Sequence, residues 1–150
     1  MNRQQLLGRL ESAWRDLRAS YAHLPDSAMM EPGVTGSWSV RDIIAHVSSW
    51  EEEALSHLPG FVAGVRPPKY SHRYGGIDAF NARVIEALKG LSLAEVLRRR
   101  DETHRRLLDY LRAVPEGQIA RETPFRRRLR LDTYGHYPKH AAAIRQWRSK

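Results

Sequence analysis

The chain has no cysteine among its 150 residues. Disulfide bonds, thiolate nucleophiles and cysteine-bound zinc are therefore excluded, and a metal ion would need histidine, carboxylate or water ligands. No apolar run approaches the roughly 20 residues of a membrane-spanning helix. The opening "MNRQQLLGRLESAW" carries acidic and polar residues, which argues against a secretory signal. We therefore expect a mature chain that begins here, a cytoplasmic location and no membrane partner.

Several motifs of common enzymes and of nucleic-acid binders are also missing. There is no P-loop, no dinucleotide fingerprint and no nucleophile elbow. The net charge is +8, and arginine runs at 98–100 and 126–130 suggest a phosphate-binding surface or solvated helix faces. Aromatic residues for base stacking do not interleave with these runs. Solvated faces are the favoured interpretation, and nucleic acid is not an expected partner, although attraction of an anionic small molecule stays open.

Helical periodicity dominates, and no segment alternates with period two. We predict one domain over residues 1–150, an all-α fold of four long helices with a short extra helix and a long connection. The long connection spans about Pro59 to Gly76, and "PEGQIARETPFRRRLRLD" is predicted as another connection. The predicted helices span about Asn2 to His23, Ser39 to Leu58, Ile77 to Leu88, Ser92 to Val114, and from near Thr133 onward.

Two of these helices have clear starting signals. Ser39 is followed three residues later by Asp42, and Ser92 by Glu95. This spacing predicts capping boxes, in which a side-chain oxygen at the helix start accepts a backbone N–H of the first turn.

The segment "TYGHYPKHAAAIRQW" places two histidines, His136 and His140, four residues apart. On a helix this spacing puts both imidazoles on one face, with about 5–6 Å between their Cβ atoms. Pro138 between them is best tolerated in the first turn. The pair is therefore predicted near a helix start, where two imidazoles could bind one metal ion.

A third ligand is needed for a useful site. His46 interrupts the apolar stripe of its predicted helix, and helix bundles build metal sites from such inward side chains. His104 lies on another inward stripe and competes with His46, or all of these histidines are core residues. Three histidines would suit Zn²⁺, Ni²⁺, Fe²⁺ or Mn²⁺, and the sequence does not choose among them.

Other candidate residues have alternative interpretations. Tyr134 and Tyr137 flank the histidine pair as proton donors or, alternatively, as packing residues. The run Glu51, Glu52 and Glu53 is interpreted as a solvated face, with one of them as a candidate for a pocket mouth. A competing hypothesis, without catalysis, is an apolar small-molecule pocket lined by Trp38, Trp50, Tyr74 and His104.

Four segments together resemble the DinB-like superfamily: "PGVTGSWSVRDIIAHVSSWEE", "IDAFNARV", "LSLAEVLRRRDETHRRLL" and "TYGHYPKHAAAIRQW". The resemblance covers about residues 2–147, and within the superfamily it is closest to the branch of the colibactin self-resistance proteins. It implies a four-helix bundle, often a homodimer. It also implies a divalent metal held by one histidine of the second helix and two of the last, which match His46, His136 and His140.

The activities that the resemblance implies are diverse. Metal-bearing relatives include thiol-dependent transferases and isomerases that use a low-molecular-weight thiol, whereas the colibactin-resistance branch opens an electrophilic ring without a general need for the metal. We therefore expect a metal-dependent thiol transferase or hydrolase acting on a small electrophile. The alternative is a non-catalytic small-molecule binding or sequestering protein, or a metal-independent resistance protein of the colibactin type.

Overall fold

The computed structural model describes residues 1–150, which form helices and connections without a strand. The helices are α1 (Arg3–Ser20), α2 (Asp26–Met29), α3 (Val40–Val62), α4 (Tyr70–Arg73), α5 (Ile77–Leu88), α6 (Leu93–Ala113), α7 (Pro124–Asp132) and α8 (Tyr137–Arg148), with a 3-10 turn at Glu116–Gln118. The predicted all-α class is confirmed.

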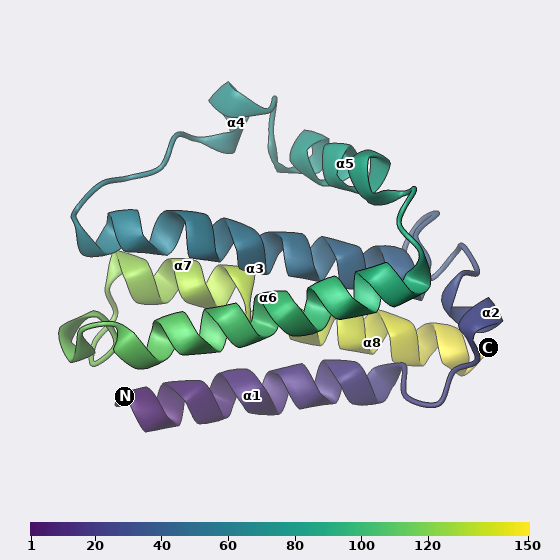
Figure 1. Ribbon diagram of the computed structural model, residues 1–150, viewed down its shortest axis with the longest axis horizontal. Coiled ribbons are helices and arrows are strands. Elements are labelled where there is room, and N and C mark those ends of the chain that lie inside the picture. Colours follow the sequence, from purple (N-terminus) through teal and green to yellow (C-terminus); the bar gives the residue numbers. More distant parts are fainter.

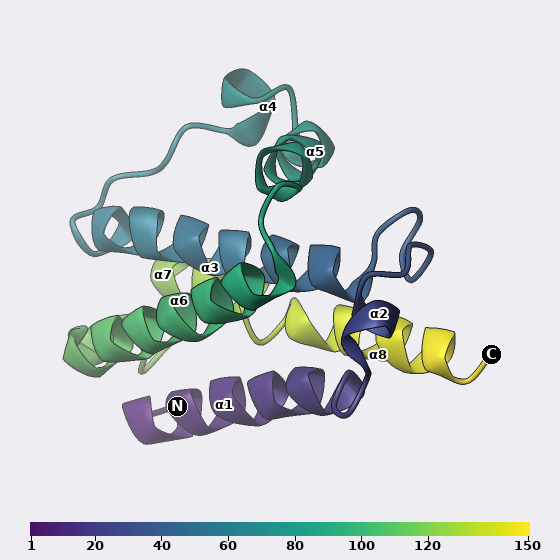
Figure 2. The same ribbon diagram turned by 45° about the vertical axis from the view of Figure 1, so that its right-hand side comes forward.

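Four rods of helix form the bundle, and the fourth rod consists of α7 followed by α8 (Figure 1). The long helix α3 packs against both α6 and α7, and α1 packs against α8. The connection after α3 carries the chain back over that helix, so that α3 and α6 run in the same direction. The short helices α4 and α5 lie on the side of α3 that faces away from α1 (Figure 2).

Polar side chains fix the starts of the long helices. The Ser39 hydroxyl accepts the Asp42 N–H, and the Asp42 carboxylate accepts the Ser39 N–H, which completes the predicted capping box of α3. Ser92 accepts the Glu95 N–H at the start of α6, but the Glu95 side chain does not accept the Ser92 N–H, so only half of the predicted capping box forms there. Because such caps satisfy N–H groups that a helix start leaves open, they set the register of the histidine-bearing α3.

Three boundary predictions are wrong. A helix, α7, occupies the second half of the segment predicted as a connection, because Thr123 caps it and Pro124 occupies its first position. The last helix begins at Tyr137 and not near Thr133. Helix α3 continues to Val62 through Pro59, because a proline in the last turns removes a single hydrogen bond while the flanking apolar side chains still pack on the bundle.

The core is a cluster of 24 buried apolar residues contributed by all four rods. It holds α3 in the centre and α8 against α1, which fixes the position of the helix start at Tyr137 relative to α3. None of the helices combines the length and apolar character that crossing a bilayer requires.

Candidate metal centre

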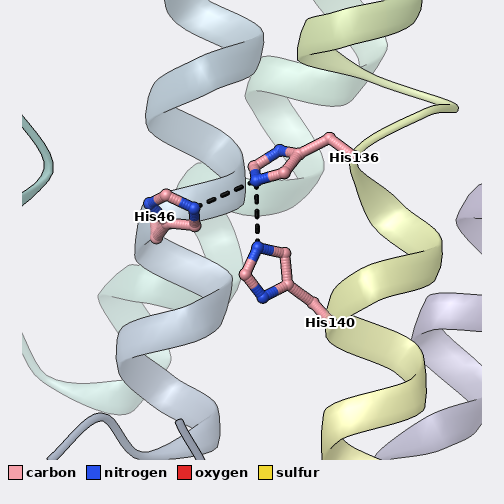
Figure 3. A group of neighbouring side chains, drawn as sticks. All are labelled: His46, His136 and His140. Carbon is pink, nitrogen blue, oxygen red and sulfur yellow. Dashed lines mark hydrogen bonds between the residues drawn. The ribbon is translucent and has the colours of Figure 1, made fainter. Parts of the chain in front are cut away.

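Three histidines from two rods meet at the junction of α7 and α8. His46 projects from the second turn of α3, His136 is the residue that caps α8, and His140 lies in the first turns of α8 (Figure 3). The Nε2 atom of His136 lies 3.0 Å from Nε2 of His46 and 2.9 Å from Nε2 of His140. The structure thus brings together the three histidines that the sequence singled out, and we call them the histidine triad.

The triad fits a divalent ion by its donor atoms and their spacing. One ring nitrogen from each histidine lies within 4.8 Å of the others. Two nitrogens bound to one ion at about 2.0–2.1 Å in tetrahedral geometry are about 3.3 Å apart, close to the separations of His136 Nε2 from each of the other two Nε2 atoms. No carboxylate or backbone group competes for the converging Nε2 atoms, so the donor set is purely imidazole.

The environment keeps all three imidazoles uncharged. Burial, followed by the neighbouring His136 and His140, lowers the pKa of His46 to about 2. Burial, with His140 and Lys139, lowers the pKa of His136 to about 3, and burial and Lys139 lower that of His140 to about 4. At neutral pH the triad therefore presents lone pairs and no positive charge, as metal ligation requires.

This electrostatic arrangement predicts acid lability of the metal-free protein. The lowered pKa of His140 means that, from pH 6.5 down to about 4, the unfolded chain takes up a proton that the folded chain does not. Each such histidine lowers the free energy of unfolding by about 1.4 kcal/mol per pH unit in that window. In a His140→Leu variant, we expect the free energy of unfolding to fall less steeply with falling pH than in the unaltered protein. The difference between the two slopes should be about 1.4 kcal/mol per pH unit. Urea unfolding midpoints at pH 6.5, 5.5 and 4.5 measure it, and parallel curves for both proteins would contradict it.

A cavity of about 520 Å³ opens beside the triad. Helices α3, α4, α5, α7 and α8 all contribute to its wall, as does Trp38, two residues before the start of α3. Trp50 forms one face of the cavity, and its indole N–H donates to Asn81 of α5 at 2.8 Å. Helices α4 and α5 thus close the outer side of a site whose inner side is the bundle.

A buried ion pair lies in the same cavity wall. The Nε atom of Arg128 donates to the Asp132 carboxylate at 2.7 Å, and its terminal nitrogen donates to the Tyr70 hydroxyl at 2.7 Å. Tyr70 in turn donates to Glu53 at 2.8 Å. Burial raises the pKa of Asp132 to about 7, although Arg128 lowers it. The sequence patterns did not single out this pair. Its i, i+4 spacing brings the two side chains together only on a helix, and the segment that forms α7 was predicted as a connection.

His104 lies away from the triad, and it does not line the triad's cavity. It stacks on Trp14 with ring centroids 3.9 Å apart. Its Nδ1 lies 2.7 Å from the buried Glu51 and its Nε2 lies 2.6 Å from Glu11. Burial opposes a charge on His104, but the two carboxylates raise its pKa. His46, not His104, therefore meets the histidine pair, and the pocket predicted from Trp38, Trp50, Tyr74 and His104 does not form as one site.

The two candidate tyrosines do not line the triad's cavity either. Tyr134 is buried among core residues. Tyr137 is fully buried, and its hydroxyl donates to Glu51 at 2.5 Å. The prediction that Glu51 to Glu53 form a solvated face is wrong at Glu51, which is fully buried because it accepts from Tyr137 and pairs with His104. Both tyrosines therefore pack in the core, and Tyr137 also hydrogen-bonds within the bundle.

Most of the arginines in the two runs are engaged with neighbours. Arg99 contacts Glu52, Arg100 contacts both Asp101 and the Tyr21 hydroxyl, and Arg130 contacts Glu122. The prediction that these runs are solvated helix faces is wrong at Arg100, which is buried, whereas Arg98 and Arg127 are exposed.

The sequence and the fold both resemble those of known proteins. A family profile described as DinB superfamily matches residues 9–143. A search of curated protein sequences finds no match. Among solved structures, "Sibling Lethal Factor Precursor - DfsB" superposes with a TM-score of 0.81 at 17% identity, covering 99% of this chain and 96% of that one.

Two further structures share the fold. The colibactin self-resistance protein ClbS, solved in complex with a dsDNA, has a TM-score of 0.81 at 13% identity, with 98% of this chain and 95% of that chain covered. An uncharacterised protein from Escherichia coli UTI89 has a TM-score of 0.80 at 12% identity, with 99% and 93% covered. At these identities the likeness concerns the fold alone, whereas the family profile spans most of the sequence. The chain belongs to the DinB superfamily.

Proposed function

We propose that the protein is a metal-dependent thiol transferase or hydrolase that acts on small electrophiles. The observation that carries the proposal is the convergence of three uncharged imidazole nitrogens, from His46, His136 and His140, at the wall of a cavity. A divalent ion held there supplies a Lewis acid that lowers the pKa of water or of a thiol. Three protein ligands leave a coordination position open, which is typical of catalytic and not of structural sites.

The chain's own residues would bind and orient the reactants. Trp38 and Trp50 offer aromatic surface to the electrophile, and α4 and α5 restrict the access of water to the cavity. The Arg128 guanidinium lies in the wall, held in place by Asp132 and Tyr70, and is available to the negative charge that develops on the electrophile during attack.

The first experiment is elemental analysis of protein purified without a histidine tag and without added metal. We expect about one zinc, nickel, iron or manganese per chain, and consumption of a low-molecular-weight thiol with a small electrophile that stops on chelation and returns on metal addition. A protein that takes up no metal on titration would contradict the proposal. Turnover that is unaffected by chelation would favour the metal-independent alternative.

That alternative is a resistance or sequestering protein of the ClbS type, favoured by the shared fold. It predicts binding or ring opening of an electrophile by protein from which all metal has been removed. A cytoplasmic location is a further part of the proposal, because small thiols are abundant in that compartment. A homodimer is another part of it. Sedimentation equilibrium tests the second.

A further inference from the structure

We propose that the cavity beside the triad takes a ligand with an apolar body, a ring or a short chain, and a single anionic group, with the anionic group turned toward the histidines. The inference deepens the proposed function and rests on it for the anionic end. The apolar end rests on the outer rim of the cavity and is independent of metal.

The outer rim carries two unusually exposed aliphatic side chains. Ile77, the first residue of α5, is 54% exposed, and Leu131 of α7 is 70% exposed. Only two other large apolar residues of the chain, Val65 and Met30, are comparably exposed, and neither lines this cavity. Ile77 and Leu131 are 54 positions apart in the sequence, yet both line the cavity that also contains Trp50 and the triad. An exposed apolar rim around a concave site is typical of ligand binding.

The inner end favours negative charge. The triad has no carboxylate among its members, so a divalent ion held there keeps its full charge. Asp132, one of the two acids that line the cavity, is already paired with Arg128. Lys139 also lines the cavity and forms no ion pair. The remaining acid, Asp78, is exposed at the start of α5 beside Ile77, on the outer side.

The size of the cavity limits the ligand to a small molecule. A volume of about 520 Å³ lies within the roughly 300–1,000 Å³ of ordinary ligand pockets. A phenyl ring with a short anionic arm is of suitable size, and we expect the ring to lie at the rim and the arm to point toward the histidines.

The test compares two thiols that differ in their body, phenylmethanethiol and 2-mercaptoethanol. Each is titrated by calorimetry into zinc-loaded protein whose zinc content has been measured. We expect phenylmethanethiol to bind at least about tenfold more tightly, and the double variant Ile77→Ser/Leu131→Ser to lose most of this preference. The matched control is Val65→Ser/Met30→Ser, which removes equally exposed apolar side chains elsewhere and should keep the preference.

The outcomes separate the two proposals. If zinc binds but both thiols bind equally, or if the rim variant and the control behave alike, the inference is overturned and the proposed function stands. If no zinc binds, the proposed function and the anionic end fail together. The apolar end is then decided by methyl NMR of the metal-free protein titrated with phenylmethanethiol: shifts of the Ile77 and Leu131 methyl groups support it, and their absence overturns it.

Discussion

Replacing His140 with alanine is expected to remove nearly all bound metal while leaving the helix content unchanged. The apparent binding free energy of a four-ligand zinc site is about 10–16 kcal/mol, or about 3 kcal/mol per ligand. Loss of one imidazole should therefore weaken metal binding at least about a hundredfold. Alanine suits a helix interior, and the His140 side chain hydrogen-bonds within the protein only to His136, so the fold should persist.

Competition with a chromophoric chelator measures the affinity, and far-ultraviolet circular dichroism measures the helix content. His72→Ala is the matched control, because His72 is exposed on α4 and takes no part in the triad. His46→Ala should behave like His140→Ala, although the ligand comes from a different rod. Unchanged metal affinity in either triad variant would contradict the assignment of that residue as a ligand.

Replacing Glu51 with leucine should be among the most destabilising single substitutions in the bundle. The fully buried Glu51 accepts the hydroxyl of Tyr137 and pairs with Nδ1 of His104. Leucine has a similar size but leaves the Tyr137 hydroxyl and the Nδ1 atom of His104 without a hydrogen bond, at about 1–3 kcal/mol for each group. We expect the free energy of unfolding to fall by about 3 kcal/mol, measured by urea denaturation.

Two comparisons separate this effect from a general cost of leucine. Glu86→Leu, at an exposed glutamate of α5, should change stability little. The triple variant Glu51→Leu/His104→Leu/Tyr137→Phe removes the partners as well and should recover much of the loss, because an apolar replacement of a whole buried polar group is often neutral. A triple variant no more stable than Glu51→Leu would show that packing, and not unpaired polar groups, dominates at this position.

Local sequence patterns were sufficient to predict the bundle and the pairing of two of the three histidines. Apolar spacing and the Ser39–Asp42 cap predict α3, and these features are local. The pairing of His136 with His140 is also local, since it needs only helical spacing. The choice of His46 over His104 came from the family resemblance. Apolar periodicity places both histidines on inward helix faces, but it does not say which of them lies beside His136 and His140.

The features that were missed depend on contacts between distant segments. Glu51 looks like part of an acidic surface run, and its burial follows from His104 of α6 and Tyr137 of α8, 53 and 86 positions away. Helix α7 was missed because its face is rich in arginine, and its stability comes from Phe125 and Leu129, which pack into the core. Tertiary contacts of this kind override local composition.

The triad joins two parts of the chain that are 90 positions apart. An ion bound to His46 and His136 would act as a cross-link, because it would close a loop that contains α4, α5, α6 and α7. A link of this length strongly reduces the conformational freedom of the unfolded chain, provided that the ion stays bound. If the ion instead binds only the folded form, it stabilises that form in proportion to the logarithm of its free concentration, so that the free energy of unfolding would rise with the availability of metal.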